Sequence, residues 1–209
     1  MSIFYHDLGK YIEALEGVSI TEDRKRVLDD LAEKITAGHK NDLVRLVFIC
    51  THNSRRSHFA QIWASVLAAR FGLEFIEAWS GGTEATAFHP NALAALERAG
   101  FVVDSEPGPN PVHLLSYGEA QPPLLCFSKV YDHPDNPTTG FAAIMTCSDA
   151  EENCPFIPGA DWRFSLTYSD PKIADGTPEE AATYDARLRE IGGELWYVMD
   201  RVRQHTASE

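Results

Sequence analysis

Long apolar segments and an excess of positive charge are both missing from this sequence of 209 residues. No apolar run is long enough to span a bilayer, and the chain does not begin with the basic and then apolar pattern of a secretion signal. Lysine and arginine number 18 against 31 aspartate and glutamate residues, which gives a formal net charge of −13. Because no basic patch stands out, we expect no nucleic-acid partner, no membrane partner and a cytoplasmic location.

Cysteine is scarce as well, and the chain holds four: Cys50, Cys126, Cys147 and Cys154. In a reducing compartment such cysteines more often serve catalysis, redox chemistry or metal binding than structural disulfides. The chain is 44% hydrophobic and can bury a sizeable core, and its length suits one domain with an appendage. We expect residues 1–42 to form a helical N-terminal extension and residues 43–209 to form the main α/β domain.

The chemical signal is concentrated between residues 44 and 57. The apolar run Leu46-Val47-Phe48-Ile49 predicts a buried strand, and apolar residues recur at helical spacing from Arg55 to Phe71. Cys50 directly follows the strand, and Arg56 comes six positions later. A loop that enters a helix N-terminus presents backbone N–H groups and the positive end of the helix dipole, which bind an oxyanion and favour a thiolate. The alternative is a buried structural cysteine followed by two surface arginines.

Each side chain of this loop has a use in oxyanion chemistry. Cys50 would be the nucleophile, and Arg56 could hold two oxygens of a phosphate-like group. Asn53 tolerates a left-handed backbone, and Ser57 could donate a hydrogen bond to the sulfur. We therefore predict an oxyanion-binding loop that consists of Thr51, His52, Asn53, Ser54, Arg55, Arg56 and Ser57.

The first 42 residues carry helix signals and no strand signal. Leu8, Ile12 and Leu15 fit one face of a short helix. Ser19-Ile-Thr-Glu22 is a capping box that would open a second helix ending at Gly38. These residues suggest no chemistry, so we expect a helical hairpin that packs on the main domain or on a partner subunit.

Strand and helix patterns alternate after the central loop. Residues 73–79 predict a strand, residues 80–83 a turn, and His89-Pro90 the start of a helix through Ala99. Residues 101–103 are a short strand or an edge. The alternation predicts an α/β fold with an open, mostly parallel four-stranded sheet flanked by helices on both faces.

An excursion rich in proline, glycine and asparagine interrupts this pattern at about residues 104–140. Two apolar fragments within it fit a hairpin or an extended excursion, and Cys126, in the second, is expected to be a buried apolar residue. Further strands are predicted at residues 141–146 and 162–168. Thr177 should cap the last helix, with Pro178 at its first position and an end near residue 203.

Three more candidate residues follow strands whose carboxyl ends should meet at one edge of the sheet. Cys147 ends one of these strands, and Cys154 comes seven positions later in what we read as a flexible redox loop. This pair could bind zinc, but no second ligand pair has zinc-like spacing, so we expect no metal. Asp170-Pro171 ends another strand, and Asp170 there is either a general acid or part of a turn.

Together these residues resemble the low-molecular-weight protein tyrosine phosphatases, and more closely the thioredoxin-coupled arsenate reductases of that superfamily. The resemblance runs from about residue 44 to the end of the chain, outside the excursion. It rests on Cys50-Thr-His-Asn-Ser-Arg-Arg56-Ser57, on Met145-Thr-Cys147 with Cys154-Pro155, and on Asp170-Pro171. Phosphatases of the family use the first and third of these motifs, whereas the second is similar to the reductase branch.

The resemblance implies an arsenate reductase that needs no cofactor. Cys50 would attack arsenate, held by Arg56 and the loop amides, and Asp170 would protonate the departing oxygen. Cys147 would then attack Cys50 and expel arsenite, and Cys154 would carry the disulfide outward to thioredoxin. The alternative is a tyrosine phosphatase acting on phosphotyrosine, in which the cysteine pair protects the nucleophile; a non-catalytic oxyanion or redox sensor is a third possibility.

Three residues depart from the family pattern. Gln61 stands where reductases often have a glutamate that helps to bind potassium, so we predict no metal there. His52 stands where the family usually has glycine, so the loop is either narrowed or carries an imidazolium that stabilises the thiolate. Arg55 stands where many relatives have a second cysteine or an apolar residue. It adds positive charge beside the site, which favours anions without selecting one of them.

Overall fold

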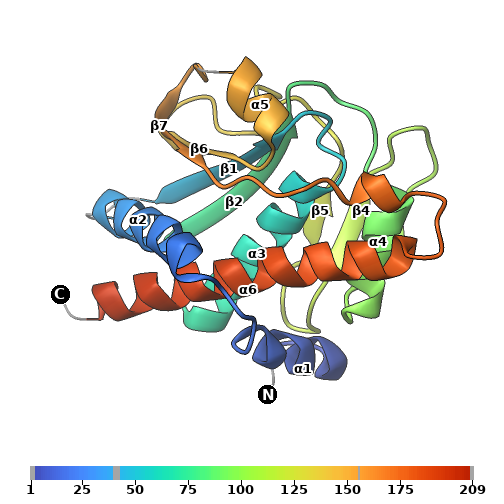
Figure 1. Ribbon diagram of the computed structural model, residues 1–209, viewed down its shortest axis with the longest axis horizontal. Helices are drawn as coiled ribbons and strands as arrows, with labels where there is room; N and C mark the ends of the chain where they lie inside the picture. The colour runs from blue at the N-terminus through green and yellow to red at the C-terminus, as the bar shows by residue number, and fades with distance from the viewer. Residues whose placement is uncertain (1–2, 40–42, 155, 208–209) are drawn as a thin grey trace.

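A four-stranded parallel sheet forms the centre of the computed structural model, which describes residues 3–39, 43–154 and 156–207 (Figure 1). Its strand order is β2-β1-β6-β7, with all neighbours parallel. The strands are β1 (Val44–Cys50), β2 (Ile76–Gly82), β6 (Phe141–Met145) and β7 (Ala160–Ser165). The predicted α/β class, strand number and orientation are therefore confirmed.

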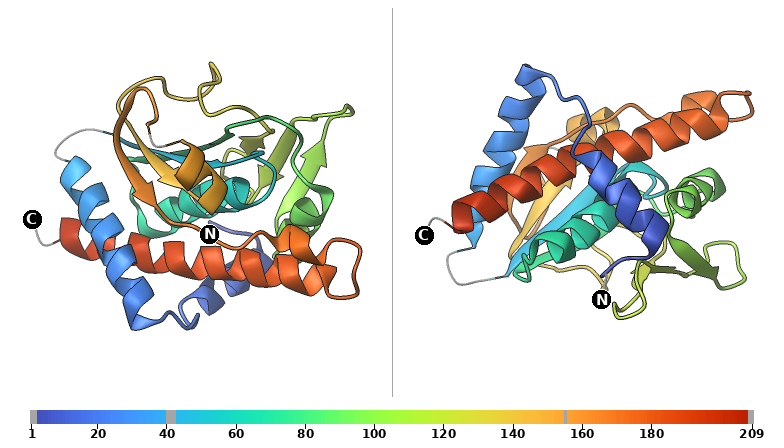
Figure 2. Two further views of the ribbon diagram at one scale, coloured as in Figure 1. Left: turned by 45° about the horizontal axis from the view of Figure 1, so that its top comes forward. Right: turned by 90° about the horizontal axis from the view of Figure 1, so that it is seen from below.

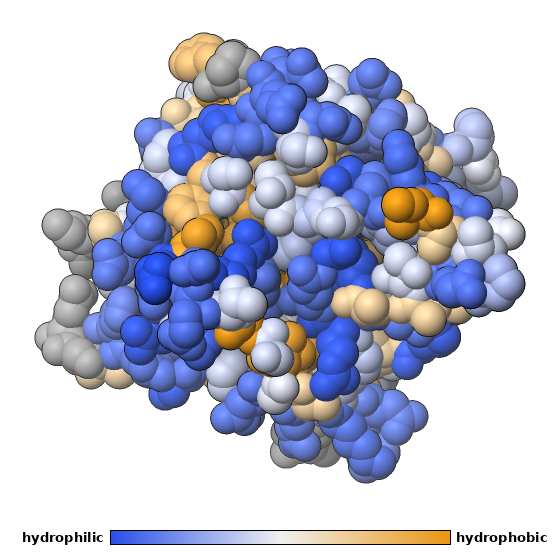
Figure 3. Space-filling view, in the orientation of Figure 1, coloured by the Kyte–Doolittle hydropathy of each residue, from blue (hydrophilic) through white to orange (hydrophobic). Residues whose placement is uncertain are grey.

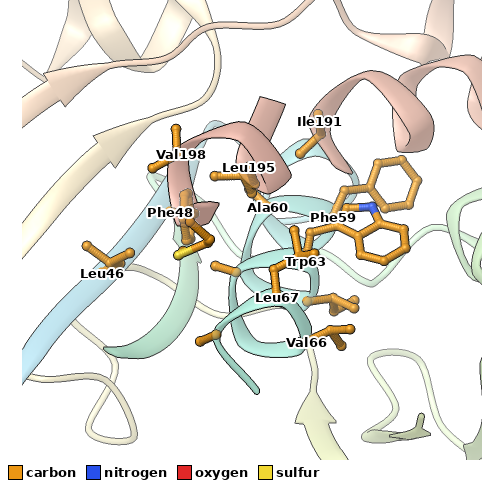
Figure 4. Packing of buried hydrophobic residues seen from close by; sticks show 14 of the residues in the cluster. Leu46, Phe48, Phe59, Ala60, Trp63, Val66, Leu67, Ile191, Leu195 and Val198 are labelled. Carbon is orange, nitrogen blue, oxygen red and sulfur yellow. The ribbon is translucent and has the colours of Figure 1, made fainter. Parts of the chain in front are cut away.

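One face of the sheet holds most of the core. Alternate residues of β1, Leu46 and Phe48, point to this face because successive strand side chains point to opposite sides. They pack against α3 (Arg56–Phe71) and share one core cluster with the buried residues of α6 (Glu180–Thr206). Figure 4 shows Ala60 of α3 beside Leu195 of α6, and Phe48 of β1 beside Val198 of α6. Along α6, a buried stripe is formed by Ile191, Leu195, Val198 and Val202.

The other face of the sheet has a thinner cover than the predicted layer of helices. Val47 and Ile49 point to it and pack with Met145 of β6. The helical part of this cover is α5 (Ser148–Asn153), a helix of six residues. Loop residues, Tyr131 and Ile157 among them, supply the rest. Cys50, Cys147 and Cys154 all lie in or against this second cluster.

The N-terminal helices α1 (His6–Leu15) and α2 (Glu22–Gly38) lie against α6, as Figure 2 shows. Their buried residues belong to the same cluster as those of the main domain. Gly192 and Gly193 of α6 allow this close approach. A Cβ atom at Gly193 would lie 2.5 Å from the Cβ atom of Val18, and one at Gly192 would lie 3.1 Å from the Cδ1 atom of Leu15. The division of domains at residue 42 stays a prediction.

The excursion forms a small second sheet, with strand order β3-β4-β5. Its strands are β3 (Val102–Ser105), β4 (His113–Ser116) and β5 (Leu124–Cys126), all antiparallel. This arrangement contains the hairpin that the two apolar fragments predict. The preceding helix α4 (Pro90–Arg98) begins at His89, as predicted, and contacts α6 and β3.

Several predicted boundaries are wrong. Strand β2 continues through residues 80–82, where a turn is predicted, and β7 ends three residues before residue 168. Thr21, not Ser19, caps α2 and accepts a hydrogen bond from the Arg24 amide. Thr177 does not cap α6; its hydroxyl closes the 3₁₀ turn η1 (Pro171–Ala174) by donating to the Ala174 carbonyl. The predicted redox loop contains the ordered helix α5.

The surface drawn in Figure 3 is mostly hydrophilic, and its apolar side chains lie in small separate groups. Phe156 and Ile173 are the most exposed large apolar residues among those described, at 76% and 86%. None of the helices described has the length and apolar character that crossing a bilayer requires.

Candidate active site

Cys50 lies at the carboxyl end of β1, buried and in contact with the first turn of α3. Its Sγ atom is 3.1 Å from Ser57 Oγ, which is the contact that the sequence predicts. The residue before α3, Arg55, gives the helix no side-chain cap, so the first N–H groups of α3 remain available for a bound anion. A thiol, a hydroxyl and a helix N-terminus therefore meet at one point.

The backbone of the loop is held from outside through its carbonyl oxygens. The Cys50 and Thr51 carbonyls accept hydrogen bonds from the amides of Thr83 and Glu84, at 3.1 and 2.8 Å. The His52 carbonyl accepts from the Ser128 hydroxyl at 2.9 Å. Because the C=O and the following N–H of a planar trans peptide point in opposite directions, the N–H groups turn away from these partners. They therefore face the opposite side of the loop, from which a bound oxyanion could accept hydrogen bonds.

Asn53 has the left-handed backbone that the sequence predicts, with φ of 44°. Its side chain is completely buried and makes two hydrogen bonds. The amide nitrogen donates to Ser57 Oγ at 2.9 Å, and the oxygen accepts from the Lys129 backbone N–H at 2.9 Å. The side chain therefore compensates for the strained backbone by joining the middle of the loop to Ser57 at its end and to the excursion.

Arg56 and Asp170 form an ion pair of 2.7 Å between Nη2 and Oδ2. Arg56 Nη1 also donates to the Tyr168 carbonyl at 2.9 Å. Arg56 is buried, and its Nε atom has no partner among the described residues. The fold thus brings Asp170 to the oxyanion loop, as the sequence predicts for a general acid. Asp170 is also the N-cap of η1, where its Oδ1 accepts from the Lys172 amide.

The flanking residues His52 and Arg55 have partners of their own. The His52 imidazole is 3.9 Å from the Glu84 carboxylate and is partly exposed. The Arg55 guanidinium contacts Tyr184 and Asp175. Sequence reasoning did not find Tyr184, Asp175 or Ser128, since nothing in their local pattern marks them as neighbours of the loop.

Cys147 lies at the same edge of the sheet, one strand away from Cys50. The Ile49 and Met145 positions of β1 and β6 are in register, and Cys147 Sγ is 3.5 Å from Thr51 Oγ1. Cys147 is the N-cap of α5, and its sulfur accepts from the Ala150 amide at 3.4 Å. The structure therefore brings Cys147 to the oxyanion loop.

Cys154 is the C-cap of α5 and is half-buried. The helix between the two cysteines places their Cα atoms about 10 Å apart, at about 1.5 Å rise per residue. This exceeds the limit of about 7 Å for a disulfide. Cys154 is thus near the site but not in reach of Cys147 while α5 is helical.

Cys126 lies apart from this group, in β5 of the second sheet. It is completely buried, and burial raises the pKa of its thiol to about 12. This environment is the apolar one that the sequence predicts. Within the described ranges, no three histidine, cysteine, aspartate or glutamate side chains are grouped so that they could hold a metal ion.

Comparison with known proteins gives the family. Residues 45–111 match the family described as low molecular weight phosphotyrosine protein phosphatase. An arsenate reductase of Bacillus licheniformis is 30% identical over 149 residues, which cover 71% of this chain and 89% of that protein. An arsenate reductase of Bacillus subtilis is 28% identical over 151 residues, which cover 72% of this chain and 91% of that protein.

A solved structure agrees at the level of the fold. The low molecular weight phosphotyrosine phosphatase of Vibrio cholerae superimposes with a TM-score of 0.51 at 15% identity, covering 75% of this chain and 95% of the other. The chain is therefore an enzyme of the low molecular weight phosphotyrosine protein phosphatase family, close to the arsenate reductases.

Proposed function

We propose that the protein is an arsenate reductase that uses Cys50, Cys147 and Cys154 in succession and is reduced by thioredoxin. The observation that carries the proposal is the contact between Cys147 Sγ and Thr51 Oγ1 at 3.5 Å. It brings a second cysteine to the loop that holds the first, and both lie in one apolar cluster. Ester hydrolysis needs no such cysteine, whereas reduction of arsenic(V) needs two electrons from a pair of thiols.

The first step is displacement at arsenic. The Cys50 thiolate, which Ser57 stabilises, attacks arsenate bound by Arg56 and the loop N–H groups. An S–As bond forms and an As–O bond breaks. Asp170 gives its proton to the departing oxygen, which leaves as water.

The second step transfers the electrons. Cys147, as a thiolate, attacks Cys50 Sγ, and the electron pair of the S–As bond passes to arsenic. Arsenic(V) becomes arsenic(III), arsenite leaves, and Cys50 and Cys147 form a disulfide. Bond formation needs the two sulfurs to approach directly. The step is supported by the position of both cysteines at the edge shared by β1 and β6.

The third step moves the disulfide outward. Cys154 attacks Cys147 Sγ and releases Cys50 as a thiolate. Because α5 holds the two residues too far apart, the helix must unwind for the Cys147–Cys154 disulfide to form. Contacts of Arg163 with the Glu151 carboxylate at 2.8 Å and with its carbonyl hold α5 in the helical state. Thioredoxin would then reduce this disulfide and become oxidised itself.

A tyrosine phosphatase is the second candidate, favoured by the ion pair of Asp170 with Arg56. An acid at this position would serve a phosphotyrosine leaving group as well as an arsenate oxygen. In that case Cys147 would only protect Cys50 by forming a reversible disulfide.

The test is NADPH consumption by the reduced protein with arsenate, thioredoxin and thioredoxin reductase, measured beside hydrolysis of a small aryl phosphate. We expect arsenate-dependent consumption that is lost in Cys147→Ser and in Cys154→Ser. Cys126→Ser is the matched control and should keep it. Two results together would establish the phosphatase instead. The unmodified protein would show no arsenate-dependent NADPH consumption, and Cys147→Ser would still hydrolyse the aryl phosphate.

A further inference from the structure

Two adjacent arginines of the oxyanion loop hold the two ends of the segment that carries the candidate general acid. Arg56 pairs with Asp170 at the start of this segment, at 2.7 Å. Arg55 pairs with Asp175 at its end, at 3.0 Å. The segment, residues 170–175, consists of these two aspartates and the 3₁₀ turn η1 between them.

The pair at the far end belongs to a closed group of hydrogen bonds. Arg55 Nε donates to the Tyr184 hydroxyl at 2.6 Å, and that hydroxyl donates to Asp175 Oδ1 at 2.7 Å. Arg55 Nη2 donates to Asp175 Oδ2 and completes the triangle. Tyr184 is a fully buried residue of α6, and its ring stacks on His89, the N-cap of α4. Asp175 is thereby tied to the loop and to α6 together.

The middle of the segment packs on α6 through the buried residues Pro171 and Ala174, and its other two side chains make no polar contact with another element in the described part of the chain. Lys172 is exposed and Ile173 is 86% exposed. The hydrogen bonds of the Lys172 and Asp175 amides stay within the segment. Among the described residues, the side-chain polar contacts that fix the segment to other elements are those of Asp170 and Asp175. The polar anchoring of the general acid therefore comes from the two arginines, and the packing of Pro171 and Ala174 adds to it.

These two arginines are not equivalent during the reaction. A bound oxyanion needs the Arg56 guanidinium, and it competes with the Asp170 carboxylate for the same N–H groups. The Arg56 pair is thus weakened when the substrate arrives. The Arg55 pair lies outside the loop centre and is not required by the substrate.

We propose that Arg55, through Asp175 and Tyr184, positions the segment 170–175 so that Asp170 stays over the oxyanion loop when a substrate occupies Arg56. Arg55 is a positioning residue in this proposal and does not touch the reacting atoms. The proposal rests on the function proposed above for Asp170. It also gives Arg55 a role other than the general attraction of anions that its charge suggests.

The first test needs no enzymatic activity. Hydrogen exchange of the backbone amides of residues 172–177, and tryptic cleavage after Lys172, report opening of the segment in the reduced protein. We expect Arg55→Ala, Arg55→Lys and Asp175→Asn each to increase both rates about tenfold. Arg98→Ala is the matched control. Arg98 of α4 makes a bidentate pair with Asp185, which lies in α6 as Tyr184 does, but Arg98 is not part of the loop. This substitution should change neither rate. Unchanged rates in the Arg55 variants would overturn the proposal.

The second test separates positioning from charge. In arsenate turnover, Arg55→Lys keeps the charge and loses the bridging geometry, so we expect kcat to fall about tenfold with KM nearly unchanged. In an Asp170→Asn background the same substitution should cause no further loss. A rise in KM alone in Arg55→Ala would show that Arg55 acts through its charge. An equal loss of kcat in both backgrounds would show that Arg55 does not act through Asp170, and either result would overturn the proposal. If the unmodified protein turns over no substrate, the proposed function fails, and hydrogen exchange still decides the role of Arg55.

Discussion

The side-chain oxygen of Asn53 accepts a hydrogen bond from the backbone N–H of Lys129 at 2.9 Å. This bond joins the oxyanion loop to the excursion, which lies far away in the sequence. The neighbouring Ser128 adds a second tie through the His52 carbonyl, and Asn110 in turn holds both backbone polar groups of Ser128. The excursion therefore stabilises the loop through hydrogen bonds to His52 and Asn53.

Replacement of Asn53 should separate its backbone role from its side-chain role. Asn53→Ala removes both hydrogen bonds and places an alanine at φ of 44°, so we expect a loss of about 2–4 kcal/mol in the free energy of unfolding. Asn53→Gly restores the backbone freedom but not the bonds, and should lose about 1–2 kcal/mol. Urea unfolding measures both, and equal losses would show that the backbone conformation contributes nothing.

Gly82 at the end of β2 should tolerate no side chain. A Cβ atom there would lie 2.2 Å from the Glu84 carbonyl oxygen, 2.7 Å from the Thr51 carbonyl oxygen and 2.8 Å from the backbone nitrogen of Asn53. Gly82→Ala must displace the loop backbone, so we expect loss of phosphate binding in calorimetry along with lower stability. The control is Gly38→Ala, since its nearest neighbour would be 3.5 Å away and helix propensity favours alanine by about 1 kcal/mol. Unchanged phosphate binding in Gly82→Ala would contradict the expected displacement.

Local sequence patterns predict the parts of the site that lie close together in the chain. Cys50, Asn53, Arg56 and Ser57 fall within eight residues between a strand and a helix, and the physics of a helix N-terminus gives each a role. The strand itself is evident from Leu46 to Ile49, because a short apolar run needs burial on both faces.

Long-range packing determines what these patterns miss. Ser80-Gly81-Gly82 has the composition of a turn, yet it continues β2 because it pairs with β1 as far as Cys50. Its glycines are needed because Tyr131 and the loop approach too closely for side chains. Thr177-Pro178 has the composition of a helix start, but the segment is used for the turn that carries Asp175. The contacts of Arg55 with Tyr184 join elements that no local signal relates.

Cys126 should prove inert in every cysteine reaction of the protein. Its pKa is raised to about 12 by burial, so its thiol stays protonated and unreactive at neutral pH. We expect iodoacetamide to leave Cys126 unmodified in the native reduced protein. Cys126→Ala should cost about 1 kcal/mol of stability and leave arsenate-dependent NADPH consumption unchanged. A fall in that rate at unchanged stability would give Cys126 a part in the relay.

The buried His58 should make the protein less stable in mild acid. Its side chain is completely buried, stacks on Phe88 and bonds Ser80 Oγ at 3.2 Å. Burial, with a smaller contribution from the Lys129 charge, lowers its pKa well below 6.5. Below pH 6.5 the unfolded chain therefore binds a proton at His58 that the folded protein does not. The free energy of unfolding must fall as the pH drops below 6.5, by up to about 1.4 kcal/mol per pH unit for this one proton.

Urea unfolding between pH 7.5 and pH 5.5 measures this slope. His58→Gln cannot take up the proton, so its stability should depend less on pH whatever its stability at pH 7.5. Burial also lowers the pKa of His113, so part of the slope should remain in this variant. His6→Gln is the control, because His6 is exposed on α1, and it should keep the full slope. An identical slope in His58→Gln and in the unmodified protein would mean that His58 takes up its proton in the folded state, which its burial beside Lys129 argues against.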